Sequence, residues 1–392
     1  MNREQKNTFL PYSLDTPVSN VFPYVFERPI LFVYSDTKLV ELASYLALGP
    51  QIYADGLLVM QQHGNKKQDN FQGESWIAKQ KVIGQIGSKH IISHLLESHP
   101  VSYRNFLHTT TAFELMDSVS DNEIIEPSSP ISRVIELFKA KKFAFVPIVS
   151  KKIVSAKNIS NPSINTENIS HENHDDIMTT TAVISVRDFL PLFIKSERKI
   201  DNVIDGVDMQ QEITIPLSEI SSNLVSVSKY DGLIDTIDLM IKRSIRNIGV
   251  RDENFNLISI LNDRCILEFL FTHKDFVMET LHYKRDDYTK DRNNNIGTSS
   301  KQNRLGQYNI HNRYYTNNNM DVPGSINSIM SDLHVIPLSK VKVKNTTTLS
   351  AAAKLLTDLH TPCLVLEEGD TIVTPWDVVM KTAEKNKALE GK

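Results

Sequence analysis

Cysteine and long apolar runs are the two features that this chain most clearly lacks. Only two of its 392 residues are cysteines, Cys265 and Cys363, which excludes a disulfide framework and any zinc site that needs several thiolates. So few cysteines are typical of a reducing cytosol, and we expect a cytoplasmic location. The longest apolar runs fall far short of the roughly 20 residues in a membrane helix. The first residues lack the apolar stretch of a secretory signal, so we expect neither membrane insertion nor secretion.

Excess charge and catalytic motifs are also missing. The net charge is −4, so no global positive field would attract nucleic acid or a membrane surface to the chain. The sequence contains no GxxxxGK(S/T) phosphate loop, no GxSxG nucleophile motif and no HExxH metal motif. Apolar residues make up 40% and charged residues 23% of the chain, which is typical of a globular protein.

Four segments of the chain repeat one order of elements. Each begins with a short β-rich run, passes through a turn into an amphipathic helix, and continues with two apolar strands and a last helix. The fourth segment shows the shortest form, in which a turn at Glu368-Gly369-Asp370 separates the two later strands. Its first helix has the apolar spacing of a buried stripe, at Leu349, Ala352, Ala353, Leu355, Leu356 and Leu359. We therefore predict four βαββα units rather than unrelated domains.

The repeat sets the expected boundaries. The predicted units one to four span residues 25–97, 112–197, 212–272 and 326–386. Unit two carries a polar insert at 151–176 between its later strands, and unit one a smaller insert near 61–80. Surface hairpins tolerate such variation, because the cost of loop closure grows slowly with length. The Asn-rich stretch 275–325 lacks apolar periodicity for most of its length, which predicts a flexible linker or a long loop.

The junction between the third strand and the last helix is the most specific repeated feature, and we call it the seam. The seams end the stretches "GQIGSKH" (84–90), "AVISVRD" (182–188), "SILNDRC" (259–265) and "TIVTPWD" (371–377). Four such stretches in register, each after the same order of elements, resemble cystathionine-β-synthase (CBS) domains. The signature of that family is glycine, two apolar residues, Ser or Thr, two variable residues, and Asp or Asn. Ala182 and Thr371 replace the leading glycine in the two best matches.

The resemblance covers nearly all of the chain outside the inserts and the linker. It implies an α/β (α+β) fold in which units one and two, and units three and four, pair into two pseudo-twofold Bateman modules. It also implies a regulatory protein that binds adenosine-type ligands between units and signals to a partner protein. The expected ligand is AMP, ADP, ATP or S-adenosylmethionine, with no resident cofactor. The open alternative is a CBS-fold interaction or dimerisation scaffold that binds no nucleotide.

The seams of units two and four carry the candidate ligand-binding residues. A helix start exposes unpaired N–H groups and a partial positive charge, which suits a phosphate. Ser185 and Thr374 at the N-cap have hydroxyls that can face a phosphate. Asp188 and Asp377, one turn later, can accept hydrogen bonds from two ribose hydroxyls. The same spacing is also that of a capping box, which stabilises a helix without any ligand.

The residues beside these carboxylates differ between the two seams. Arg187 would favour phosphate charge at the unit-two seam, whereas Trp376 stands at the matching place in unit four. Pro375 at the first helical position supports the capping interpretation of the unit-four seam. We count Arg187 and Trp376 as candidate ligand contacts, with exposed first-turn residues as the alternative.

Units one and three have weaker seams. His90 and Cys265 stand where the other units have Asp, and neither accepts two hydroxyls as a carboxylate does. We expect structural half-sites there, with Ser88 and Asn262 as helix caps. Each module would then keep one competent seam, in its second unit.

The remaining candidates concern metals, partners and catalysis. "HENHDD" (171–176) has metal-ligating residue types but no visible scaffold, so we expect a solvated loop and no metal site. The basic, Tyr-containing stretch 283–320 has a composition that can contact RNA, although we expect a plain linker. The apolar stretches 266–271 and 378–380 on the last helices predict pairing between units, within the chain or in a homodimer. No segment remains for a catalytic domain, so we expect no enzyme activity.

Overall fold

The computed structural model describes residues 12–48, 56–61, 81–98, 103–141, 145–152, 177–194, 215–273, 325–367 and 370–390. Nearly all of the expected linker 275–325, of the unit-two insert 151–176 and of the unit-one insert near 61–80 lies outside these ranges. The stretch 171–176, considered for a metal, and the basic stretch 283–320 also lie outside them.

The first module contains the elements of units one and two, where η denotes a 3-10 helix. In chain order they are α1 (Val18–Val21), η1 (Pro23–Glu27), β1 (Phe32–Tyr34), α2 (Leu39–Leu48), β2 (Leu57–Met60), β3 (Val82–Ile86), α3 (Ser88–Ser98), α4 (Tyr103–Thr109), α5 (Ala112–Leu115), β4 (Asp117–Ser118), η4 (Asp121–Glu123), α6 (Ile131–Lys141), β5 (Phe145–Lys152), β6 (Ile177–Ser185) and η6 (Val186–Phe193).

The second module contains the elements of units three and four. In chain order they are η7 (Leu217–Glu219), β7 (Ser222–Asn223), β8 (Ser226–Ser228), α7 (Leu233–Arg243), β9 (Asn247–Arg251), β10 (Leu257–Asn262), α8 (Asp263–Thr272), α10 (Ile326–Ile329), β11 (Ile336–Pro337), α11 (Leu338–Val341), β12 (Lys342–Val343), α12 (Leu349–Asp358), β13 (Leu364–Leu366), β14 (Thr371–Val373) and α13 (Pro375–Glu390).

The strand pairing has the predicted βαββα order in all four units. The first strand of a unit runs parallel to the second, and the second runs antiparallel to the third. Unit two keeps this order with β5 and β6, and its first strand is reduced to a bridge between Ile125 and Ile148. The predicted fold class, four βαββα units paired into two modules, is therefore confirmed.

Three of the sheets gain a fourth strand from the other unit of the same module. The sheet orders are β1-β2-β3-β4, β11-β10-β9-β8 and β12-β13-β14-β7. In each case the added strand stands just before the first strand of its own unit, and we call the residues there the lead segment. The lead segments of units one to four are residues 23–28, 117–118, 222–223 and 334–337. The lead segments of units two, three and four thus connect the two units of a module through strand pairing.

Small apolar cores fill the contact between the sheets of each module. In the first module, Leu58, Met60 and Phe145 are buried against one another. Gly56 lies here with a φ of 146°, and a Cβ at this position would lie 2.3 Å from the Phe145 ring, so only glycine fits. In the second module, Ile260 and Val365 belong to the corresponding core.

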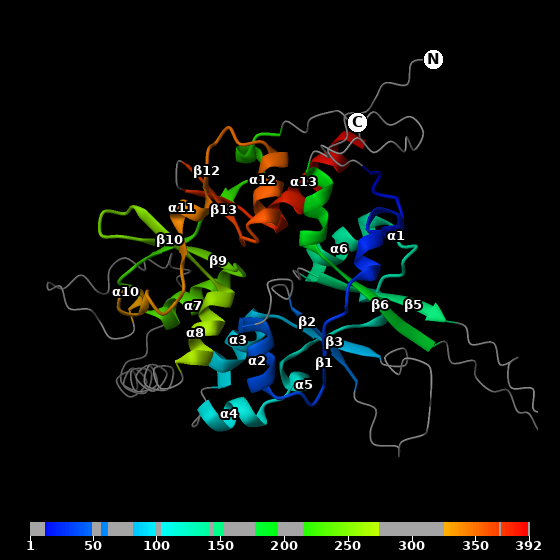
Figure 1. Cartoon of the computed structure of the whole chain (residues 1–392), viewed down its shortest axis with the longest axis horizontal. Helices are drawn as coiled ribbons and strands as arrows, with labels where there is room; N and C mark the ends of the chain where they lie inside the picture. Colours follow the sequence, from blue (N-terminus) through cyan, green and yellow to red (C-terminus); the bar gives the residue numbers. More distant parts are fainter. Residues whose placement is uncertain are drawn as a thin grey trace, which may run out of the picture.

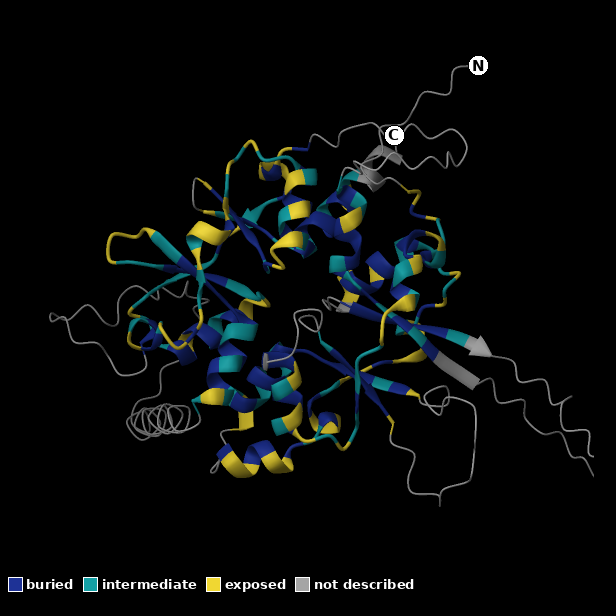
Figure 2. Ribbon diagram, in the orientation of Figure 1, coloured by how far each residue is buried: buried dark blue, intermediate teal, exposed yellow. Residues whose placement is uncertain are grey.

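Larger apolar cores join the modules to each other. One core combines helices of units one and three, and the other combines units two and four. Figure 1 shows the four units around a common centre, and Figure 2 shows the buried helix faces on the sides where units meet. Val378 and Val379 of α13, and Phe269 and Leu270 of α8, are buried in these cores, and each such side chain contributes roughly 1.5–3 kcal/mol. The apolar faces of the last helices are therefore covered within the chain.

The last element of unit two is a 3-10 helix, η6, where the other units have α-helices. Pro191 lies inside it, and proline removes a backbone donor and clashes with the carbonyl of an α-helical turn. Phe189 compensates by burying its ring among Phe22 and Phe138, with centroid distances of 4.7 and 6.0 Å.

Candidate functional site

The unit-two seam, residues 185–188, begins with a reciprocal capping box. The Ser185 hydroxyl accepts a hydrogen bond from the Arg187 N–H at 3.2 Å, and the Ser185 N–H donates to the Asp188 carboxylate at 2.7 Å. Ser185 is extended, with φ of −117° and ψ of 164°, as an N-cap residue normally is. The cap therefore fixes the position of Asp188, whose side chain is only 6% exposed.

The Asp188 carboxylate is also bound by a side chain from the unit-one lead segment. Both terminal nitrogens of Arg28 donate to it, at 2.7 and 2.9 Å, and one of them also donates to the Val183 carbonyl at 2.9 Å. Tyr24 donates to the Asp188 backbone carbonyl at 2.6 Å. Burial is the main cause that raises the pKa of the Tyr24 hydroxyl above its usual value, so this group stays a donor at neutral pH.

The unit-four seam, residues 374–377, has the same cap. The Thr374 N–H and hydroxyl both donate to one Asp377 oxygen, at 2.9 and 2.6 Å, and the Asp377 N–H donates back to the Thr374 hydroxyl at 3.2 Å. Pro375 occupies the first helical position, where its missing N–H costs nothing. The whole Asp377 residue is 7% exposed.

The second Asp377 oxygen is bound by the unit-three lead segment. The Ser222 hydroxyl donates to it at 2.5 Å. Lys381, one turn further along α13, lies 3.8 Å from the same oxygen and donates to the Ser222 hydroxyl at 2.9 Å. A hydroxyl therefore occupies this carboxylate oxygen, where the unit-two seam has a guanidinium.

The seams of units one and three use other residues for the same two roles. At residues 87–90 the His90 Nδ1 accepts the Gly87 N–H at 2.9 Å, while its Nε2 lies 3.4 Å from Asp117. Ser88, expected as the cap, is instead the first residue of α3, because Gly87 holds the N-cap place and His90 supplies the acceptor. At residues 262–265 Asn262 is the cap, as expected, and accepts the Cys265 N–H at 2.7 Å.

One contact recurs at the third helical residue of every seam. His90 reaches Asp117, Asp188 reaches Arg28, Cys265 donates to the His334 carbonyl at 3.4 Å, and Asp377 reaches Ser222. Each partner belongs to the lead segment of the other unit in the module. The third helical residue of each seam therefore contacts the other unit of the same module, which we call the module mate.

A different contact recurs at the second helical residue and crosses between modules. Lys89 donates to the Ser244 hydroxyl at 3.4 Å, Arg187 to the Thr361 carbonyl at 3.4 Å, and Arg264 to the Ala47 carbonyl at 3.4 Å. Trp376 packs on Phe138 with ring centroids 6.4 Å apart. Each of these partners lies near the carboxyl end of the first helix in the facing unit. Arg187 and Trp376, expected as ligand contacts, therefore also connect the modules.

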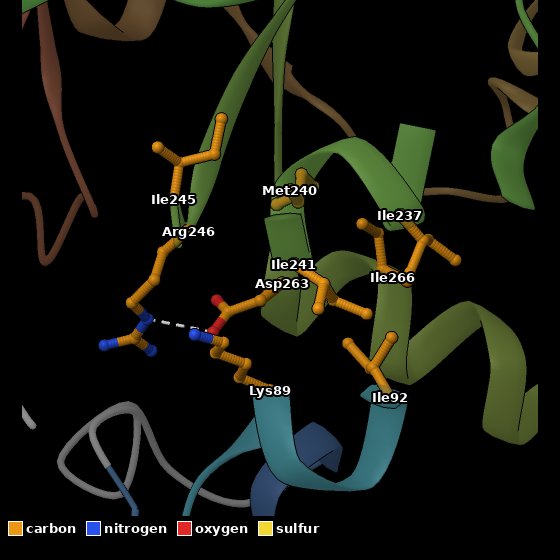
Figure 3. A pocket seen from close by; sticks show the side chains of 9 residues that line it. All are labelled: Lys89, Ile92, Ile237, Met240, Ile241, Ile245, Arg246, Asp263 and Ile266. Atoms are coloured by element: carbon orange, nitrogen blue, oxygen red, sulfur yellow. Dashed lines mark hydrogen bonds and ion pairs between the residues drawn. The ribbon is translucent and has the colours of Figure 1, made fainter. Parts of the chain in front are cut away.

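A small pocket lies at one of these crossings. Figure 3 shows Lys89 and Ile92 of unit one opposite Arg246 and Asp263 of unit three, whose side chains form a 2.8 Å ion pair. The space in this pocket is about 20 Å³, which holds about one water molecule. A nucleotide does not fit there without movement of the units.

Both cysteines are poor nucleophiles. Burial is the largest cause that raises the pKa of Cys265 to about 11 and of Cys363 to about 12. The thiols are therefore protonated at neutral pH, and a thiolate is the reactive form.

The described residues contain neither a membrane-spanning helix nor a cluster of metal-ligating side chains. Within these ranges no helix is both long and apolar enough to cross a membrane. In the same part of the chain, no three His, Cys, Asp or Glu side chains gather as a metal site requires.

The comparisons with known proteins concern mainly the fold. No protein-family model matches the sequence. The uncharacterized protein MJ1426 of Methanocaldococcus jannaschii is 25% identical over 151 residues, which are 38% of this chain and 82% of that protein.

The solved structures that match this chain include the following two. Protein MJ1225 of Methanocaldococcus jannaschii, reported as a candidate archaeal homologue of g-AMPK, matches with a TM-score of 0.53 and 15% identity over 90% of this chain and 95% of its own. CBSX2 of Arabidopsis thaliana, solved in complex with AMP, matches over 45% of this chain and 96% of its own, with 17% identity and a TM-score of 0.25. Together with the repeated seams and strand pairing described above, the first likeness shows that the chain has the fold of a CBS-domain protein with four units in two modules.

Proposed function

We propose that the chain is a non-catalytic, cytoplasmic regulatory protein that binds an adenosine-type nucleotide at its seams. Binding would cause a conformational change that a partner protein recognises. The observation that carries the proposal is that every seam contacts two other units. The third helical residue contacts the module mate, and the second contacts the facing module. A ligand that moved one helix start would therefore act on three units at once.

The unit-four seam has the chemistry for a nucleoside. The Ser222 hydroxyl already donates to Asp377 at 2.5 Å, so this carboxylate oxygen accepts a hydroxyl in the geometry that a ribose hydroxyl would use. Lys381, 3.8 Å from Asp377, adds a cation, and Trp376 adds an aromatic face. Each hydrogen bond from a ligand hydroxyl to the carboxylate would contribute roughly 1.5–3 kcal/mol.

Phosphate groups have basic partners at the other seams. The second helical residue is Lys89, Arg187 and Arg264 in units one, two and three. Each is part of a helix start, where the partial positive charge also favours an anion. Of these three cations, Arg187 crosses to unit four at the Thr361 carbonyl, so this cation favours a ligand with phosphate groups over a neutral nucleoside.

The alternative function is a scaffold whose seams are only caps and unit contacts. The Arg28–Asp188 ion pair favours it, because both oxygens of that carboxylate are already occupied by a guanidinium. In this alternative the fold serves to pair modules, within the chain or in a homodimer. No ligand is then needed to stabilise any seam.

A thermal unfolding screen separates the two functions. The purified chain would be melted with AMP, ADP, ATP, S-adenosylmethionine and, as a control for the base, GMP. A ligand at 100 times its dissociation constant should stabilise the folded state by about 2.7 kcal/mol. Stabilisation by an adenosine ligand, absent in the Asp377→Ala and Asp188→Ala double variant, supports the proposal. A melting temperature unchanged by every ligand supports the scaffold.

A further inference from the structure

The two carboxylates of the proposed sites meet different groups at matched positions. Arg28 and Ser222 each stand four residues before the first strand of their own βαββα unit, β1 at Phe32 and β8 at Ser226. Arg28 contacts Asp188 and Ser222 contacts Asp377. Equivalent positions in the two modules thus place different groups on the carboxylate, a guanidinium cation in the first module and a neutral hydroxyl in the second.

The guanidinium is much the stronger occupant. It forms two parallel bonds to Asp188, and this bidentate charge-assisted geometry is roughly twice as strong per bond as neutral hydrogen bonding. Its third bond, to the Val183 carbonyl at 2.9 Å, fixes the fork in place. The Ser222 hydroxyl makes a single bond to Asp377 and carries no charge, and Lys381 stays 3.8 Å from the same oxygen when this hydroxyl rotates away.

Arg28 is open to solvent, whereas its carboxylate partner is buried. Its side chain is 44% exposed, whereas that of Asp188 is 6% exposed. A ligand hydroxyl that reached Asp188 would have to break both guanidinium bonds and leave the carboxylate without a cation. At Asp377 an arriving hydroxyl replaces another hydroxyl, and Lys381 stays near the charge.

We propose that Arg28 is a built-in competitor that closes the unit-two seam to hydroxyl-bearing ligands, so that the unit-four seam alone binds them in the native chain. The inference rests on the proposed function and specifies its regulation. It also gives position 28 a testable role, since a neutral residue there should open the second site.

The test counts binding events for AMP by titration calorimetry. We expect one event in the native chain, none in Asp377→Ala, and two in Arg28→Ser, which copies the residue at position 222. The new event should be absent with 2′,3′-dideoxy-AMP, which lacks both hydroxyls that Asp188 would accept. The reverse variant, Ser222→Arg, should weaken the native event by about tenfold or more, since it adds two charge-assisted bonds to Asp377.

The Arg28 variants are expected to fold like the native chain. Arg28 lies on the surface, outside the apolar cores, and circular dichroism would verify that Arg28→Ser and the alternative Arg28→Gln are folded. Two events in the native chain, with one lost in Asp188→Ala, overturn the inference and leave the proposed function standing. A single unchanged event in both Arg28 variants also overturns the inference. No binding by the native chain or by either Arg28 variant overturns the inference and the AMP-binding function together.

Discussion

The unit-two and unit-four seams have the same cap but different neighbours. In both, a Ser or Thr at the N-cap and an Asp at the third helical residue form a capping box. The difference comes from the lead segment, which brings Arg28 to one carboxylate and Ser222 to the other. Local sequence thus positions the carboxylate, and a distant segment determines whether a guanidinium or a hydroxyl binds it.

The unit-two and unit-four seams are also connected to each other. Units two and four meet in one apolar core, and their second helical residues, Arg187 and Trp376, cross to each other's unit. Packed side chains therefore connect these two seams. The two seams need not bind the same ligand for one to influence the other.

The largest expected effect is a loss of stability when the packing of η6 in unit two is disrupted. Phe189→Ala removes a fully buried ring that packs on Phe22 and Phe138, and we expect a loss of about 3–5 kcal/mol in unfolding free energy. Phe113→Ala, at a side chain that is 61% exposed, is the matched control and should change stability by less than about 0.5 kcal/mol. Urea unfolding measures both variants. Equal midpoints for the two variants would contradict the packing described for η6.

Double-mutant cycles compare the two carboxylate pairs directly. For Arg28→Ser with Asp188→Ala we expect a coupling free energy of about 2 kcal/mol, reduced from that of a buried pair because Arg28 is half exposed. For Ser222→Ala with Asp377→Ala we expect about 1 kcal/mol, since one partner is neutral. Urea unfolding of the single and double variants gives both values. A larger coupling at Asp377 would reverse the comparison.

The caps should behave alike in the two seams. Ser185→Ala and Thr374→Ala each remove an N-cap hydroxyl and should cost about 1 kcal/mol. Gly substitutions at the same positions should cost only a few tenths of that, because glycine is a tolerated N-cap. Thermal unfolding measures the four variants. A cost confined to one seam would show that the capping boxes are not equivalent.

Thiol chemistry gives the smallest effect. The pKa of Cys363 is raised to about 12, chiefly by burial, so at pH 8 a thiol reagent should label it only after the chain unfolds. The unfolded thiol has a lower pKa than the folded one. Below the pKa of the unfolded chain, the protonated Cys363 thiol therefore favours the folded state. This contribution to the unfolding free energy is lost as the pH rises toward the folded pKa of about 12. Rapid labelling of Cys363 in the native chain at pH 8 would contradict its burial.

Sequence patterns predicted the unit order and the caps because both are local. Most of the buried stripe of α12 and the Ser185, Thr374 and Asn262 caps follow from residues within one helical turn. Leu359 was wrongly placed in that stripe, because it stands after the last helical turn, at the C-cap, and is 53% exposed. The roles of Arg28 and Ser222 could not be predicted, since their carboxylate partners lie 160 and 155 residues away in the sequence. His90 was also missed as a cap acceptor. A ring nitrogen is a less common acceptor there than Glu or Gln.

The unit boundaries remain a prediction, and the lead segments give a reason to adjust them. Asp117 and Ser118 fall within the predicted unit two, yet they complete the sheet of unit one. Ile336 and Pro337 likewise fall within unit four and complete the sheet of unit three. A unit cut out at its predicted boundaries would therefore lose a strand from its module mate.

The most direct test of the account compares Asp377→Ala with Asp188→Ala in the presence of AMP. Thermal unfolding would be followed for both variants and the native chain, with and without the nucleotide. The account predicts that AMP raises the melting temperature of the native chain and of Asp188→Ala, but not that of Asp377→Ala. Loss of the response in Asp188→Ala alone, or an equal response in all three proteins, would contradict it.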